Sequence, residues 1–476
     1  MSNPSSEAKA RIEALLDANS FVEIGAGVTA RNTDFNLSLK KAPSDGVVTG
    51  YGRIEDRLVY IYSQDPDVLG GTVGEMHARK IVNIYRLALK VGVPVIGLID
   101  CGGMRLEEAG DGLFAFGEIY HAMADASGVI PQITAVYGKC GGGMALVPAM
   151  ADFSLMATDG ELFVNSPDAM PGSSADKLNT ASAHFQSEEA GNVDFAGTKE
   201  EVAAKIRTLV SVLPTNNEDD LGYTETEDDP NRESADLAAC VKDPMMILAR
   251  IADDGRVIEL KKDYGPDMVT ALFSLNGYTV GAVANRSASY KEDGTIDREY
   301  GSVISARGAE KAAKFVRFLD AFSIPVVTFT NVDGFKASVC GERRIAGRAA
   351  QLAYAFTDAT TPKINVITCK AFGSAALVMN SRSTGADMVF AWDGARIGMM
   401  DAKEAAKLMN DTADAGEIKA KAAEYDQLQN SVESAAARGY VDTVINPAET
   451  RKYLIGTIEM LFTKRETRFD KKHGTV

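Results

Sequence analysis

The chain has 476 residues, of which 45% are hydrophobic and 24% are charged, and its formal net charge is −16. These values are those of a globular protein long enough for two ordinary domains. The acidic balance argues against nucleic acid or an anionic membrane surface as the main partner, since both attract basic patches.

No secretory signal is evident at the N-terminus, and no apolar run approaches the roughly 20 residues that span a bilayer. The five cysteines lie far apart and form no C-x-x-C pair: Cys101, Cys140, Cys240, Cys340 and Cys369. Such a set indicates free thiols in a reducing compartment. The four histidines are equally scattered, so no metal site is expected. These features predict a cytoplasmic protein, which a partner subunit could attach to a membrane.

From the N-terminus onward, strand patterns alternate with helix patterns. VVTGYGRIEDRLVYIYS (47–63) has the β-branched and aromatic residues of strands, whereas ARKIVNIYRLALKVG (78–92) has helical periodicity. ITAVYG (133–138) is then a buried strand, and CGGGMALV (140–147) turns from it into an apolar helix. This alternation is typical of α/β units.

The same series returns later in the chain at a fixed offset. VGVPVIGLIDCGGM (91–104) matches FSIPVVTFTNVDGF (322–335), and residues 129–147 match residues 360–378, both at an offset of 231. Farther on, Ala151-Asp152 pairs with Ala386-Asp387 at 235, which requires a four-residue insertion. Several segments in one order at one offset indicate two homologous halves.

The acidic, polar segment 213–237 separates the halves. We interpret it as a solvated linker rather than an acidic docking segment, since blocks of like charge usually stay solvated. The predicted domains are residues 1–235 and 236–476.

One glycine-rich turn from strand to helix falls in each half, and such a turn presents free backbone N–H groups at a positive helix end. Neither turn fits a P-loop or a dinucleotide fingerprint; Gly138-Lys139, for example, is followed by Cys140. Close packing of helix on strand would also explain the glycines. The duplication favours instead two oxyanion holes, each serving a different reactant.

Other chemical residues are weaker candidates. Cys140 fits a small buried residue better than a nucleophile. Arg105 and one of Glu107 and Glu108 are expected to brace their loop as an ion pair, with acid/base catalysis as the alternative. His77 is expected to pack or to brace a loop.

Together these segments resemble the carboxyltransferase component of biotin-dependent acyl-CoA carboxylases and decarboxylases. The first half carries DGVVTGYGRIEDRLVYIYSQD (45–65), GGTVGEMHARKIV (70–82) and CGGMRLEE (101–108). The second half carries KFVRFLDAFSIPVVTFTNVDGF (314–335), ATTPKINVITCKAFGSAA (359–376) and GYVDTVINPAETR (439–451).

The resemblance implies an α/β fold of tandem duplicated crotonase-like ββα-superhelix domains, assembled as a homo-oligomer from dimer to hexamer. The N-terminal domain would hold the acyl-CoA thioester, and the C-terminal domain would hold biotin, borne by a separate biotin carrier protein. A further partner would be a membrane decarboxylase subunit or a biotin carboxylase. The reaction would move a carboxyl group between a malonyl, methylmalonyl or glutaconyl thioester and biotin.

The resemblance also assigns site residues. Gly142 and Gly143 would donate N–H groups to the thioester oxygen, while Gly373, Ser374 and Ala375 would face the biotin ureido oxygen. Five further residues are expected along the bound coenzyme A and biotin: Gly102, Gly103, Gly334, Phe335 and Ala376. The loop 160–174 is expected to contact the acyl group.

The second half departs from the family pattern at NVDGF (331–335) and FGSAA (372–376). These departures leave open a non-catalytic scaffold that binds acyl-CoA and the biotin carrier. A crotonase-type hydratase or isomerase is the other alternative, although it would need only one half. The sequence does not choose the acyl group.

Overall fold

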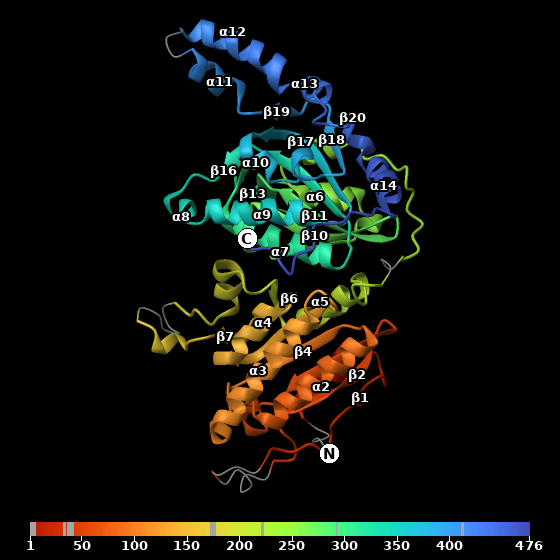
Figure 1. The fold of residues 1–476 in the computed structure, drawn as a ribbon, viewed down its shortest axis with the longest axis vertical. Helices are drawn as coiled ribbons and strands as arrows, with labels where there is room; N and C mark the ends of the chain where they lie inside the picture. Colours follow the sequence, from red (N-terminus) through yellow and green to blue (C-terminus); the bar gives the residue numbers. More distant parts are fainter. Residues whose placement is uncertain are drawn as a thin grey trace. The chain divides into compact units, whose positions relative to one another are not determined.

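The computed structural model describes residues 6–31, 35, 42–171, 178–219, 223–291, 293–410 and 414–476. The chain divides into two compact units, Met1–Gly222 and Tyr223–Val476 (Figure 1). Their boundary falls inside the acidic segment 213–237 that the sequence marks as a linker.

The first unit builds one mixed sheet and its covering helices. Its strands are β1 (Val22–Glu23), β2 (Val47–Ile54), β3 (Arg57–Gln64), β4 (Val95–Cys101), β5 (Gln132–Gly141), β6 (Phe153–Ala157), β7 (Glu161–Phe163) and β8 (Phe195–Gly197). Its α-helices are α1 (Glu7–Leu15), α2 (Glu75–Val91), α3 (Ala109–Ala126), α4 (Leu146–Met150) and α5 (Lys199–Val212). The sheet order is β1-β2-β3-β4-β5-β6-β8, with β7 beside β5.

The second unit repeats this plan. Its main sheet contains β9 (Val257–Leu260), β10 (Met268–Leu275), β11 (Tyr278–Asn285), β15 (Val326–Val332), β17 (Lys363–Phe372), β18 (Met388–Trp392), β19 (Arg396–Gly398) and β20 (Thr443–Ile445). Two small sheets pair β12 (Ala288–Tyr290) with β13 (Ile296–Glu299) and β14 (Val303–Ile304) with β16 (Gly334–Phe335). The α-helices are α6 (Pro244–Ile251), α7 (Ala306–Ala321), α8 (Val339–Glu342), α9 (Ile345–Asp358), α10 (Gly373–Leu377), α11 (Ala402–Met409), α12 (Ala415–Tyr425), α13 (Val432–Ala437) and α14 (Thr450–Leu461).

Strand register confirms the duplication residue by residue. Val95 lies opposite Gln132 where β4 meets β5, and Val326 lies opposite Lys363 where β15 meets β17. Both pairs of strands then shift register at equivalent points, just before Cys101 and Val332. The predicted insertion is present as well, because Ile133 faces Phe153 whereas Ile364 faces Met388.

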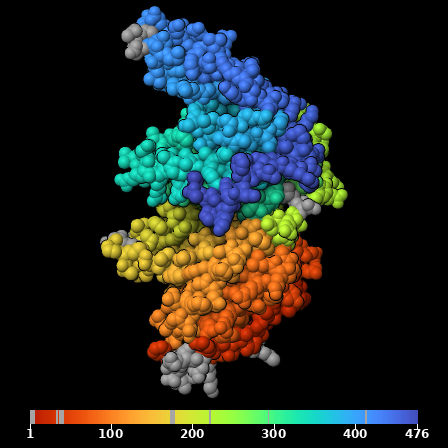
Figure 2. Space-filling view, viewed as in Figure 1, coloured from red at the N-terminus to blue at the C-terminus, as the bar shows by residue number. Residues whose placement is uncertain are grey.

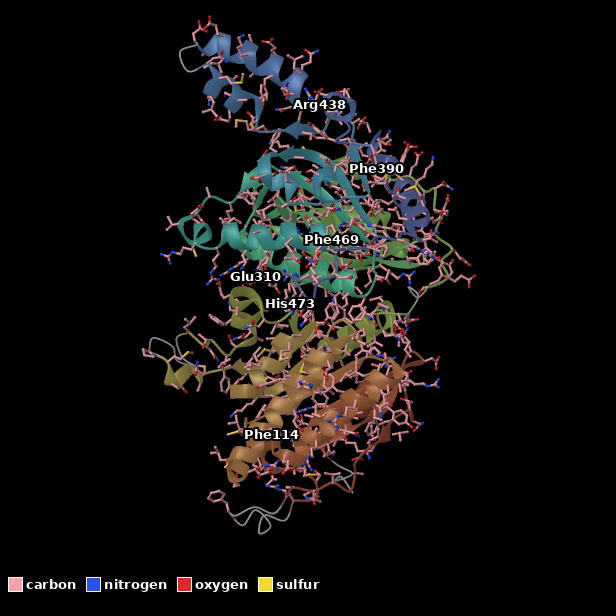
Figure 3. The ribbon with its side chains drawn as sticks, in the orientation of Figure 1. Phe114, Glu310, Phe390, Arg438, Phe469 and His473 are labelled. Atoms are coloured by element: carbon pink, nitrogen blue, oxygen red, sulfur yellow. The ribbon has the colours of Figure 1, made fainter. Side chains whose placement is uncertain are left out.

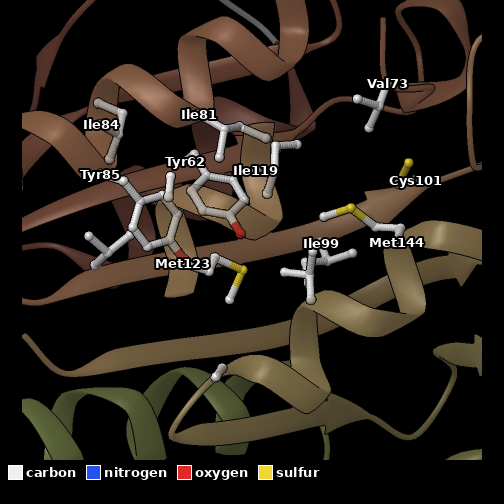
Figure 4. Packing of buried hydrophobic residues seen from close by; sticks show 14 of the residues in the cluster. Tyr62, Val73, Ile81, Ile84, Tyr85, Ile99, Cys101, Ile119, Met123 and Met144 are labelled. Carbon is white, nitrogen blue, oxygen red and sulfur yellow. The ribbon is translucent and has the colours of Figure 1, made fainter. Parts of the chain in front are cut away.

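The core of the first unit lies between the sheet and helices α2 and α3 (Figure 4). Tyr62, Tyr85 and Met123 are at most 1% exposed there. The central strand β5 is buried on both faces through its first six residues, as expected for a parallel strand covered by helices. Helix α2 ends where Gly92 adopts a left-handed φ of 72°, a usual helix stop. This core fixes the ends of β4 and β5, where the candidate site lies.

Helices α11 and α12 form a hairpin that projects from the body of the second unit, as the ribbon and the space-filling view both show (Figures 1 and 2). A capping box starts α12, since Asp414 accepts the N–H of Glu417 and Glu417 accepts that of Asp414. Leu408 and Met409, at the end of α11, are 72% and 71% exposed. The hairpin therefore carries large apolar side chains outside the core of its own unit.

Candidate active site

The turn of the first unit begins where β5 ends at Gly141. Gly142 has a φ of 60°, in the left-handed region that favours glycine, and it opens the short 3-10 helix Gly142–Ala145. The first N–H groups of a helix have no acceptor within that helix. Gly143 is exposed, Gly142 is partly exposed and Met144 is buried, so the first two residues of the turn are accessible.

The turn of the second unit starts in the same way, although an α-helix rather than a 3-10 helix follows it. Gly373 also has a φ of 60° and opens helix α10. Ser374 is exposed like Gly143, and Ala375 is 1% exposed, matching the buried Met144. The structure thus brings Gly373, Ser374 and Ala375 to the same place in the second unit that Gly142 and Gly143 occupy in the first.

Gly102 and Gly103 lie at the end of β4, directly beside the first turn. A Cβ on Gly103 would lie 3.8 Å from the carbonyl oxygen of Gly141. The N–H of Gly102 donates to the oxygen of Gly70 at 3.1 Å, and the oxygen of Gly103 accepts the N–H of Val73 at 2.9 Å. Their backbone is thus engaged within the chain, and their contribution is a loop without side chains next to the turn.

Gly334 and Phe335 form β16, which runs parallel to β14. Phe335 pairs with Ile304, and the equivalent residues Met104 and Val73 form a bridge in the first unit. The loop after β4 in the first unit and the loop after β15 in the second are therefore anchored in the same way. Unlike Gly103, with its φ of 109°, Gly334 does not adopt a positive φ.

A pocket of about 450 Å³ lies next to the second turn and is lined by Gly373, Ala376 and Leu377. Other parts of its wall come from Asn365 and Thr330 on neighbouring strands, from Met399 after β19 and from Arg438 after α13. Figure 3 shows Arg438 where the projecting helices join the unit. Residues distant in the sequence therefore enclose the space beside Gly373.

Asn365 gives this pocket a fixed polar group. The residue is 2% exposed, and its Oδ1 accepts the hydroxyl groups of Thr328 at 3.0 Å and Thr330 at 2.8 Å. Asn365 lines the pocket, and its NH2 group is a donor that these two bonds do not use. Asn365 was not predicted as a site residue, although an asparagine inside the apolar strand KINVITCK was a usable signal.

The predicted ion pair in the first unit is confirmed. Arg105 Nη1 lies 2.7 Å from Glu108 Oε1 and also pairs with Asp45, and all three side chains are at most 1% exposed. The other oxygen of Glu108 accepts the N–H of Glu75 at 2.6 Å. Both oxygens of Glu108 are thus engaged in holding the loop, which leaves none for proton transfer.

His77 and Cys140 are buried structural residues, as predicted. Nδ1–H of His77 donates to the oxygen of Asp45 at 2.9 Å, and Nε2 accepts the amide of Gln64 at 3.1 Å. Burial, reinforced by the charge of Arg105, holds the pKa of His77 well below its usual value, so the ring is neutral. Burial likewise raises the pKa of the Cys140 thiol, which is unsuited to act as a nucleophile.

The loop predicted to contact the acyl group is described as far as residue 171, and residues 172–174 lie outside the described residues. Among the described residues, no group of three or more His, Cys, Asp or Glu side chains is arranged to hold a metal ion. No helix in the described ranges is long and apolar enough to cross a membrane.

Each unit therefore carries a turn that starts with a left-handed glycine at the end of a duplicated parallel strand. Residues 5–476 match the carboxyl transferase domain family. The chain belongs to this family and is a carboxyltransferase component of the biotin-dependent acyl-CoA carboxylases and decarboxylases.

Curated relatives agree over nearly the whole chain. The methylmalonyl-CoA decarboxylase subunit alpha of Veillonella parvula is 37% identical over 98% of this chain and 92% of its own length. The propionyl-CoA carboxylase beta chain of Roseobacter denitrificans is 37% identical over 98% of this chain and 93% of its own length.

A solved structure, the transcarboxylase 12S hexamer with hydrolysed methylmalonyl-coenzyme A bound, superposes with a TM-score of 0.92 at 36% identity. It covers 98% of this chain and 92% of that chain. The predicted fold of duplicated crotonase-like domains is confirmed by this match and by the two similar sheets.

Proposed function

We propose that the first unit binds a malonyl-type CoA thioester, that the second unit binds biotin borne on a separate carrier protein, and that the chain transfers a carboxyl group between them. The observation that carries this proposal is the repetition of one left-handed glycine turn, with φ of 60° at Gly142 and at Gly373. One site would suffice for a hydratase or isomerase, whereas carboxyl transfer has two reactants that each need an oxygen stabilised.

In the first unit, the N–H groups of Gly142 and Gly143 would donate to the thioester oxygen. The negative charge that develops there in the enolate is stabilised without a charged side chain, and one such backbone or side-chain donor is typically worth about 3–4 kcal/mol of barrier. The absence of a Cβ at Gly142 and Gly143 lets the thioester approach the backbone. Gly102 and Gly103 extend this side-chain-free surface along the bound coenzyme A.

The second unit fits biotin by its donors and by its pocket. The N–H groups of Gly373, Ser374 and Ala375 would face the ureido oxygen, and the NH2 group of Asn365 supplies a further donor inside a pocket of about 450 Å³. Ala376, Leu377 and Met399 offer the apolar wall that an uncharged bicyclic ring requires. Gly334 and Phe335 are proposed to border the same ligand. Biotin, when bound, carries the carboxyl group between the two reactants.

Methylmalonyl-CoA is the thioester we propose first. Relatives at 36–37% identity are named for methylmalonyl-CoA decarboxylation, propionyl-CoA carboxylation and methylmalonyl-CoA carboxyl transfer. Methylmalonyl-CoA is a substrate or a product in each of these reactions. The reactions differ in their source of energy. A membrane decarboxylase subunit and a biotin carboxylase are accordingly the two alternative partners beside the biotin carrier protein.

We further propose that the chain works as a homo-oligomer in the cytoplasm. The transcarboxylase 12S relative is a hexamer, and the projecting α11–α12 hairpin exposes apolar residues that a second copy would cover. Attachment to a membrane would come through the partner subunit.

The test is a panel of thioesters. The purified chain is incubated with free biotin and malonyl-CoA, methylmalonyl-CoA or glutaconyl-CoA, and loss of each carboxylated thioester is followed by chromatography. We expect turnover with methylmalonyl-CoA above the other two. Turnover of none of them by folded, oligomeric protein would overturn the proposed function and favour the scaffold.

A further inference from the structure

We propose that Tyr120 is a positioning residue for the first turn: its hydroxyl holds the carbonyl group of Gly143, in the peptide that directly follows the two donor N–H groups, and so restrains the turn that carries the N–H groups of Gly142 and Gly143. This inference rests on the proposed function of that turn. It also explains why the first turn has glycine at a position where the second has serine.

Tyr120 lies in the C-terminal half of helix α3 and packs against the ring of Phe116 at a centroid distance of 6.1 Å. Its hydroxyl donates to the carbonyl oxygen of Gly143 at 2.6 Å. The same oxygen accepts the N–H of Leu146 inside the short helix. The oxygen of Gly143 is therefore held from two sides, once by the turn itself and once by a helix packed beside it.

The hydrogen bond from Tyr120 matters because the turn is built from residues with unusual backbone freedom. Gly141, Gly142 and Gly143 follow one another, and glycine peptides rotate more readily than others because no Cβ restricts φ and ψ. Donors in an oxyanion hole stabilise the transition state only if their direction is set beforehand. A hydroxyl fixed on helix α3 supplies that constraint at the carbonyl that follows the two donors.

The hydroxyl also leaves no room for a side chain at residue 143. A Cβ placed on Gly143 would lie 2.9 Å from the Tyr120 oxygen and 3.6 Å from the Phe116 ring. A contact of 2.9 Å is too close for a carbon against a hydroxyl already engaged in a hydrogen bond. A side chain at residue 143 would therefore require the Tyr120 hydroxyl to move away from its place beside the turn.

The second unit lacks this contact. At the offset of 231, Gln351 takes the place of Tyr120, and its Oε1 accepts Nη1 of Arg348 on the same helix at 2.9 Å. Ser374, the equivalent of Gly143, has an exposed side chain. Glycine therefore occurs in the turn beside the tyrosine, and serine occurs in the turn where glutamine replaces the tyrosine. The first turn thus receives a side-chain hydrogen bond from the helix beside it, which the equivalent Gln351 does not provide to Ser374 in the described residues.

Burial keeps Tyr120 in the form that can donate. Desolvation raises the pKa of its phenol above the usual value near 10. The hydroxyl therefore remains protonated throughout the range in which the enzyme would operate. Its role is geometric, and no proton transfer by Tyr120 is required.

The experiment compares Tyr120→Phe with Tyr264→Phe in the full-length chain, using biotin-dependent loss of methylmalonyl-CoA. Tyr264 is a matched control, because its partly buried hydroxyl donates to Glu310 at 2.8 Å in the second unit. We expect Tyr120→Phe to lower kcat about tenfold, with KM for the thioester changed less than twofold and an unchanged melting temperature. Tyr264→Phe should leave kcat unchanged.

A double-mutant cycle tests the steric part. Gly143→Ala should lower kcat strongly in the wild-type background and much less in the Tyr120→Phe background, because the phenyl ring lacks the oxygen that the new methyl group meets. Equal losses in both backgrounds would overturn the inference. So would an unchanged kcat in Tyr120→Phe, or losses of kcat that only follow a lowered melting temperature. A wild-type chain that turns over no thioester would instead refute the proposed function, and the inference with it.

Discussion

Gly142 and Gly143 form the part of the molecule where the smallest change in side chain should matter most. A valine at residue 143 would meet the Tyr120 hydroxyl and cover the N–H groups proposed to bind the thioester oxygen. We expect Gly143→Val to lower turnover at least a hundredfold, the typical effect of losing an oxyanion donor. The free energy of unfolding should fall by only about 1–3 kcal/mol, the usual cost of a side chain that displaces a packed neighbour, here the Tyr120 hydroxyl.

The matched control for this substitution is Gly347→Val. Gly347 is an exposed glycine of helix α9, and a Cβ there would have no neighbour within 4 Å. Steady-state assays and urea unfolding of both variants check the prediction. Parental turnover in Gly143→Val would remove the first turn from the active site.

Lys311 is a buried residue whose charge should make stability depend on pH. It is 3% exposed, donates to the oxygen of Lys261 at 2.9 Å, and burial lowers its pKa to about 7. In the unfolded chain its pKa is near 10.4, so between pH 7 and pH 10 the unfolded state binds more protons than the folded state. The contribution of Lys311 to the free energy of unfolding therefore rises with pH across that window.

Urea unfolding of the wild type and of Lys311→Met at pH 7, 8 and 9 measures this effect. We expect the wild type to gain stability relative to Lys311→Met with each step, by at most about 1.4 kcal/mol per pH unit for one proton. A difference that stays constant with pH would show that Lys311 remains protonated in the folded chain.

At the scale of elements, the repeat was the most informative feature of the sequence. The offset of 231 predicted which strands correspond, and Pro94 and Pro325 indeed precede β4 and β15 in matching register. The glycine turns were predictable for the same reason, because they follow β5 and β17 directly.

The pocket beside Gly373 was not predictable from these patterns. It joins Asn365 on β17 with Met399 and Arg438, which come from segments far along the chain. The Tyr120 contact was missed for a similar reason, since α3 and the first turn meet only through packing. Local periodicity locates strands and helices, whereas side chains that converge from separate elements depend on their tertiary arrangement.

The α11–α12 hairpin is the element that we expect to contact another subunit. Replacing both Leu408 and Met409 by glutamate should shift the chain to a smaller oligomer, because the exposed apolar surface that a second copy would bury becomes charged. Light scattering after gel filtration measures the mass, and circular dichroism checks folding. Lys403→Glu on the same helix changes charge alone and should keep the wild-type mass. An unchanged oligomer in the double variant would exclude the hairpin from the interface.

At the scale of the whole molecule, the chain contains two copies of one fold, and the proposed function divides two reactants between them. Each unit has its own sheet and its own turn, and the turns differ in their surroundings: Tyr120 beside the first, and Asn365 with its pocket beside the second. The duplication supplies each unit with a turn whose first glycine has a φ of 60°. Under the proposed function, these differences suit one unit to a thioester and the other to a bicyclic urea.

The most direct test of this account is a titration of free biotin at a saturating concentration of methylmalonyl-CoA, with loss of the thioester as readout. We predict a rate near zero without biotin that rises with biotin and then saturates. Loss of methylmalonyl-CoA at the same rate with and without biotin, in folded and oligomeric protein, would contradict it.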